Sequence, residues 1–119
     1  MGIRINAIHA TQLGVIAALV DGQVSQVEMD TLVAKISERF RVDAEEVTRL
    51  AKGMVDLYQR LRINTSPAIA LQYSIKSLDN LSTFDKRTAF EIAEQVIVSG
   101  GVDGVEKGFL AQLKIFARV

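Results

Sequence analysis

Apolar residues recur at helical spacing along almost the whole chain, and short polar stretches interrupt them. Side chains that are apolar every three to four residues indicate amphipathic helices. Leu32, Ile36 and Phe40 show this spacing clearly. No segment alternates between apolar and polar residues for more than a few positions, so we expect no sheet. The predicted helices span residues 6–20, 26–40, about 44–61, 67–79, about 83–98 and about 104–116.

Capping residues mark where several of these helices begin. Ser66 precedes Pro67, and proline is well tolerated at the first helical position because its missing N–H would be unpaired there anyway. Asp43 is followed three residues later by Glu46, which predicts a second helix start with a capping box. The connections are short, and no linker separates two domains. We therefore predict one all-α domain over residues 1–119, a compact bundle of about six short helices.

One stretch of the chain, residues 20–28, returns as residues 98–106. The identical pairs are Val20/Val98, Gly22/Gly100, Val24/Val102, Val27/Val105 and Glu28/Glu106. A match of this kind in a short chain predicts an internal pseudo-repeat of a helix–corner–helix unit. We call residues 20–28 the first corner and residues 98–106 the second corner.

Each corner carries the residues that stop one helix and start the next. Gly22 and Gly100 are predicted to take the left-handed conformation that ends a helix. Ser25 in the first corner can accept a backbone N–H at the start of the next helix, and Glu28 completes a capping box. Asp103 and Glu106 are expected to do the same in the second corner.

Composition narrows the classes of function. The chain of 119 residues carries 14 basic and 14 acidic residues, so no net positive charge favours nucleic acid. It has no cysteine, which excludes disulfides, thiol catalysis and cysteine-type zinc sites. No apolar run is long enough to span a bilayer, and the first residues do not resemble a secretory signal, so we expect a cytoplasmic protein.

The acidic residues of the corners are the strongest candidates for a functional site. Asp21, Glu28, Asp103 and Glu106 could surround a divalent cation such as calcium if the two corners converge. Calcium, however, takes about six to eight oxygen ligands, and three of these side chains are also expected to act in capping. Two capped corners without a metal therefore stay open as the alternative.

Several other sites are absent or weakly indicated. An EF-hand loop starting at Asp21 would need a glutamate where Leu32 stands. The glycines of the second corner lack the Gly-Lys-Ser/Thr ending of a phosphate loop. His9 is the single histidine and is expected to be a surface or half-buried residue, while Tyr58 and Tyr73 are expected to serve packing. No serine stands in a nucleophile elbow, and we expect no enzyme.

The two corners resemble those of the tellurite-resistance TerB-like family. The residues that carry the resemblance are Leu19 to Glu28 and Val98 to Glu106. In that family a similar Ala-Asp-Gly helix end, an apolar residue and a later glutamate recur at both ends of an all-helical domain. Ser99 departs from the pattern, because an aspartate is usual before the glycine.

The resemblance implies a small or divergent member of an intracellular, non-enzymatic family. Members are linked to tellurite and other stress responses, to metal-ion binding or sensing, and to membrane-associated complexes. On this basis Asp21, Glu28, Asp103 and Glu106 are the family-type acidic positions. The alternative is a protein–protein interaction module or homodimer scaffold that binds no metal.

Overall fold

Six α-helices follow one another along the chain, and the part of the chain that the structure describes contains no strand. The structure is a computed structural model that describes residues 4–20, 22–62, 66–101 and 104–118. The all-α bundle predicted from the sequence is confirmed. The helices are α1 (Ile5–Leu19), α2 (Gln26–Phe40), α3 (Ala44–Arg60), α4 (Pro67–Asp79), α5 (Thr83–Ser99) and α6 (Gly104–Ala117).

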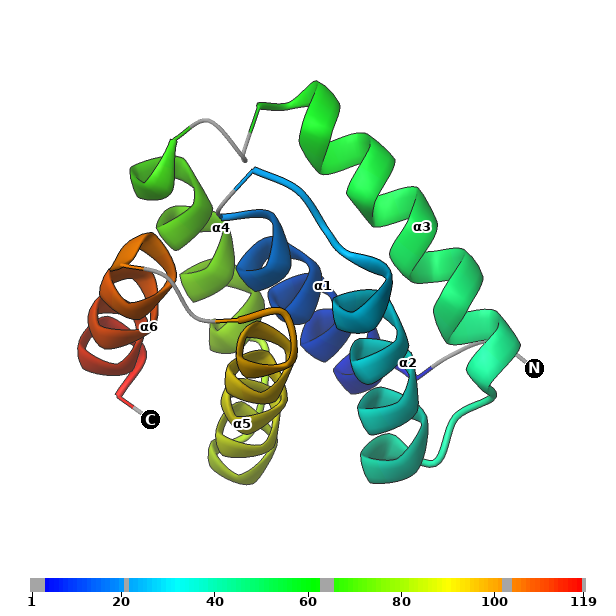
Figure 1. Ribbon diagram of the computed structural model, residues 1–119. Coiled ribbons are helices and arrows are strands. Elements are labelled where there is room, and N and C mark those ends of the chain that lie inside the picture. The colour runs from blue at the N-terminus through cyan, green and yellow to red at the C-terminus, as the bar shows by residue number, and fades with distance from the viewer. Residues whose placement is uncertain (1–3, 21, 63–65, 102–103, 119) are drawn as a thin grey trace.

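Helix α1 is the centre of the bundle. It contacts each of the other five helices, and its most extensive contact is with α5. Ten of its residues are buried, among them Leu13, Val15 and Ile16. Residues 13–19 of α1 are all apolar and all buried, and a helical segment that is apolar on all sides is stable only when other helices cover it. This composition is why the other five helices pack around α1 (Figure 1).

The remaining helices form two groups on either side of the α2–α5 contact. Figure 1 shows α2 and α5 as neighbouring columns, with α3 beyond α2 and with α4 and α6 beyond α5. The contacts agree with this view, because α2 packs on α3 and α5 while α6 packs mainly on α4. The molecule measures 37 × 29 × 24 Å along its principal axes. None of the described helices is both long and apolar enough to cross a membrane.

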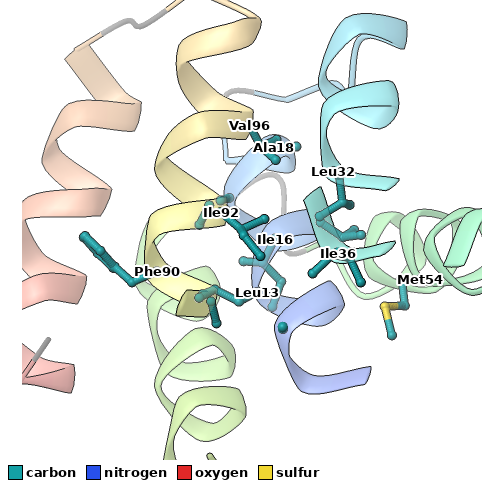
Figure 2. Packing of buried hydrophobic residues seen from close by; sticks show 14 of the residues in the cluster. Leu13, Ile16, Ala18, Leu32, Ile36, Met54, Phe90, Ile92 and Val96 are labelled. Atoms are coloured by element: carbon teal, nitrogen blue, oxygen red, sulfur yellow. The ribbon is translucent and has the colours of Figure 1, made fainter. Parts of the chain in front are cut away.

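The core is made of branched aliphatic side chains from several helices. In Figure 2, Ile92 of α5 and Ile36 of α2 reach toward Ile16 of α1 from opposite sides. All three side chains are fully buried. Met54 of α3 and Phe90 of α5 lie at the two margins of this cluster. Burial of this apolar surface is the main free-energy gain that holds the six helices together.

Gly14 allows α1 and α2 to approach each other closely. A Cβ atom at this position would overlap Cδ1 of Leu32, a side chain that is itself fully buried. Glycine in a helix interior costs about 1 kcal/mol relative to alanine. Here the close contact between the two helices explains why a glycine stands in an otherwise strongly helical stretch.

Candidate functional site

The first corner has the geometry that the sequence predicts. Gly22 has a positive φ of 114°, and its N–H donates to the carbonyl of Leu19 at 2.8 Å. Ser25 and Glu28 form a complete capping box at the start of α2. The N–H of Ser25 donates to Oε1 of Glu28 at 2.9 Å, and the N–H of Glu28 donates to Oγ of Ser25 at 3.1 Å.

The second corner differs from the first. Gly100 has a φ of −90°, which any residue can adopt, and the positive φ of 87° belongs to Gly101. The prediction that Gly100 takes the left-handed conformation is therefore wrong. Helix α5 continues to Ser99. When the two corners are aligned, the glycine with positive φ therefore stands one position later in the second corner than in the first. Because the two corners differ in this way, the predicted internal repeat is not confirmed.

Gly100 is required for a different reason, namely contact with the first corner. A Cβ atom on Gly100 would lie 2.6 Å from Cδ and 2.7 Å from Cγ of Glu28. Real side-chain carbons do not approach so closely, so the Glu28 carboxylate packs directly on the backbone of Gly100. The two corners, far apart in the sequence, thus meet in space.

The structure places only two of the four predicted metal ligands. Glu28 is 3% exposed and Glu106 is fully buried. Asp21 and Asp103 lie outside the described residues, so their part in a metal site stays a prediction. Within the described ranges no group of three or more histidine, aspartate or glutamate side chains is arranged to hold a metal ion. Glu28 already uses Oε1 in the capping box, and a carboxylate has further lone pairs for a second partner.

A cleft on another side of the molecule was not predicted from the sequence. It has a volume of about 330 Å³ and lies between the first half of α1, the last turns of α3, and α4. The lining residues are His9, Gln12, Leu57, Tyr58, Leu61, Tyr73, Lys76, Ser77 and Asn80. We call this the tyrosine cleft. Its residues come from three different segments of the chain, and no local motif joins them.

Hydrogen bonds hold the floor of the tyrosine cleft in place. Oε1 of Gln12 lies 2.9 Å from Nδ1 of His9 and 3.2 Å from Oγ of Ser77. The hydroxyl of Ser77 also lies 3.1 Å from the carbonyl of Tyr73, so it can donate to either oxygen. His9 is half-buried, as predicted, and its ring is fixed by Gln12.

The two tyrosines of the lining contact each other. Their ring centroids are 6.4 Å apart and their planes are inclined at 57°. Burial, with a smaller contribution from the neighbouring Tyr73, raises the pKa of Tyr58 to about 12. Tyr58 is 5% exposed and Tyr73 is 38% exposed, so one ring belongs to the wall and the other to the rim. The predicted packing role of both residues is confirmed. Both side chains also line the cleft.

Two of the basic residues of α2 and α3 are paired with acidic side chains. Arg39 pairs with Glu91 of α5 at 3.2 Å, and Arg60 pairs with Asp56 one helical turn away. A nucleic-acid site needs a basic patch that can follow the phosphate backbone. In these two pairs a carboxylate offsets the charge of the arginine, and the expectation that the chain binds no nucleic acid stays a prediction.

Comparison of the chain with protein-family models, with curated proteins and with solved structures finds no match.

Proposed function

We propose that this chain is a non-catalytic TerB-like binding or sensing domain of the tellurite-resistance type of stress response. In this proposal a divalent cation such as calcium binds weakly where the two corners meet. The observation that supports it is the contact between the Glu28 carboxylate and Gly100. This contact is the convergence that a shared acidic site would need.

Charge burial at the corners agrees with a cation. Moving a carboxylate out of water costs free energy that nearby donors or positive charge must offset. Glu28 and Glu106 are both buried near helix starts, where the backbone N–H groups and the helix dipole favour a negative side chain. A bound divalent ion would add to this stabilisation. Asp21 and Asp103 would complete the ligand set.

Thermal unfolding with and without cations tests the metal part of the proposal. The protein is first melted in chelator and then in millimolar calcium or magnesium. A ligand at about one hundred times its dissociation constant adds about 2.7 kcal/mol to the free energy of unfolding. An unchanged midpoint in every cation would contradict the metal site.

Two isosteric substitutions separate a metal ligand from a cap. Glu28→Gln keeps an oxygen for the capping box but removes the charge, so it should lower the cation-induced rise in melting temperature. Asp21→Asn should do the same with little effect on the metal-free protein. Glu46→Gln is the matched control, because Glu46 occupies the same position at the start of α3, away from the corners. If Glu46→Gln also lost the cation-induced rise in melting temperature, the rise would come from nonspecific binding of cations to acidic side chains.

The stress-response part of the proposal needs a test in cells. Loss of the gene should lower growth in the presence of tellurite, and the wild-type sequence should restore it. The Glu28→Gln variant should restore growth less well than the Glu46→Gln control. Equal growth of all strains on tellurite would contradict this part alone and leave the cation test standing.

A protein-interaction module or homodimer scaffold is the second candidate. Val27 and Val98 are 55% and 65% exposed, and each lies within two residues of the contact between Glu28 and Gly100. Val105, at the start of α6, is 49% exposed. Exposed apolar side chains that gather at one place are typical of interaction surfaces. A molar mass that rises with protein concentration and falls in Val98→Ser would favour the homodimer.

A further inference from the structure

We propose that the tyrosine cleft binds a small organic carboxylate that carries an apolar or aromatic group. The cleft shares no residue with the two corners, so this inference is independent of the cation proposal. Its volume of about 330 Å³ is at the lower end of the range for small-molecule sites.

The walls of the cleft offer apolar surface for the body of such a ligand. Leu57 on α3 is 48% exposed, and Leu61, the residue that caps the C-terminus of α3, is 45% exposed. Tyr73 on α4 also lines the cleft and is 38% exposed. Two leucines and a tyrosine that remain accessible around one cavity can cover an aromatic or branched aliphatic group.

The polar groups of the cleft favour a negatively charged ligand. Lys76 is the one fully charged side chain of the lining, and no acidic side chain lines the cleft. The tyrosine hydroxyls and the Lys76 ammonium form no hydrogen bond or ion pair with the described residues. The hydroxyl of Tyr58, like that of any tyrosine, is a neutral donor at physiological pH. The cleft thus presents donors and one positive charge, which a carboxylate can accept.

Gln12 is fixed so that its amide nitrogen remains a donor. Its Oε1 is the acceptor for His9 and lies within hydrogen-bond distance of Ser77, so its NH₂ group is left for another partner. With Nδ1 of His9 donating to Gln12, Nε2 is the nitrogen available to a ligand. A floor whose side chains are already held by one another loses little conformational entropy when a ligand binds.

The same features argue against a phosphate ligand. Phosphate carries more charge than a carboxylate and is bound best by arginine forks, by several cations or by a helix N-terminus. The lining contains no arginine and a single lysine. Helix α4 contributes residues from Tyr73 to its C-terminal cap, Asn80, so its N-terminus is not part of the site. One positive charge beside apolar walls matches a monocarboxylate better.

A titration followed by amide NMR spectra of the isotope-labelled protein tests the inference. The probes are phenylacetate, its neutral analogue phenylacetamide, and acetate, which has the charge but no apolar body. Phenylacetate should shift the signals of His9, Gln12, Tyr58 and Tyr73 along a saturable curve. Acetate and phenylacetamide should each bind several-fold more weakly, since each lacks one half of the recognised chemistry. Inorganic phosphate should cause no saturable shift.

Two variants and a control assign the roles of the lining residues. Lys76→Gln should weaken phenylacetate binding up to about fivefold, the upper limit for one exposed charge pair, and should leave phenylacetamide binding unchanged. Tyr73→Ala should weaken both probes. Lys107→Gln removes another exposed lysine, on α6 and outside the cleft, and should change the binding of neither probe.

Three outcomes would overturn the inference. The first is the lack of any saturable shift up to about 10 mM phenylacetate, where even a weak specific site would fill. The second is equal binding of phenylacetate and phenylacetamide, which removes the role of the charge. The third is tighter binding of a short peptide ending in phenylalanine than of N-acetylphenylalanine, which would assign the cleft to a protein C-terminus.

Discussion

The glycines of this chain have different structural roles, and these roles can be distinguished only when the neighbouring residues in the fold are known. Gly22 and Gly101 have positive φ angles and allow the chain to reverse. Gly14 and Gly100 have no such requirement, yet each lies where a Cβ would overlap a buried side chain. Gly53, in the exposed part of α3, meets nothing within 4 Å. Substitution by alanine should therefore lower the free energy of unfolding at some of these glycines and raise it at others.

Gly14→Ala should destabilise the protein although alanine is the better helix former. The added carbon would displace Leu32 within a closely packed contact, and overpacking of this kind costs about 1–3 kcal/mol. Gly53→Ala is the matched control and should raise stability by about 0.5–1 kcal/mol. Urea denaturation of both variants measures the difference. A Gly14→Ala protein as stable as Gly53→Ala would show that the two helices separate easily.

Gly100→Ala should also destabilise the protein, and the cause can be tested by a double-mutant cycle. The new Cβ would meet Glu28, whose Oε1 is held by the N–H of Ser25 and cannot simply move away. In a Glu28→Ala background the same substitution should cost much less, because the obstructing side chain is gone. Additive effects of the two substitutions would contradict direct contact between the corners.

At the scale of the helix, local signals place the ends of the elements well. Ser25, Asp43 and Ser66 each accept a backbone N–H at the start of the following helix. The predicted spans of α2 and α4 agree with the structure at both ends. Such signals act within a few residues along the chain, which is why the sequence alone carries them.

Ser25→Ala should lower the free energy of unfolding by about 1 kcal/mol, because the N–H of Glu28 loses its acceptor. Ser25→Asp should keep most of the stability, since aspartate is an equally good N-cap. Thermal unfolding of the two variants checks both statements. If Ser25→Ala melts with the wild-type midpoint, the capping box contributes little.

Contacts between helices could not be predicted in the same way. Gln12 and Ser77 meet across two helices that are distant in the sequence, and nothing local to either residue marks the other. Gly100 looked like a turn residue because glycine is common there, whereas its actual constraint comes from Glu28. Leu57 and Leu61 fit the apolar pattern of α3 but extend past the core into the tyrosine cleft. The fold class could be predicted from the periodicity of apolar residues, whereas the cleft depends on how the helices pack and could not be predicted from the sequence.

At the scale of the whole molecule, Tyr58 of the tyrosine cleft makes the free energy of unfolding depend on pH. Its pKa is about 12 in the folded protein and about 10 in an unfolded chain, so the folded state holds the proton more tightly. The resulting stabilisation is complete below pH 10 and is lost as the pH rises from 10 to 12. Tyr58→Phe should therefore lose less stability than the wild type over that interval. Tyr73→Phe should reduce this pH dependence only slightly, because Tyr73 is the smaller cause of the raised pKa of Tyr58. Denaturant midpoints measured across the interval compare the two variants with the wild type.

The central place of α1 has a consequence for synthesis on the ribosome. This helix leaves the exit tunnel ahead of the other helices, yet α5, its largest contact, emerges much later. Throughout that delay the apolar second half of α1, residues 13–19, lacks the helix that covers most of it in the folded protein. Nascent chains halted after α4 should accordingly be held by chaperones or aggregate, and release should follow once the fifth helix can dock.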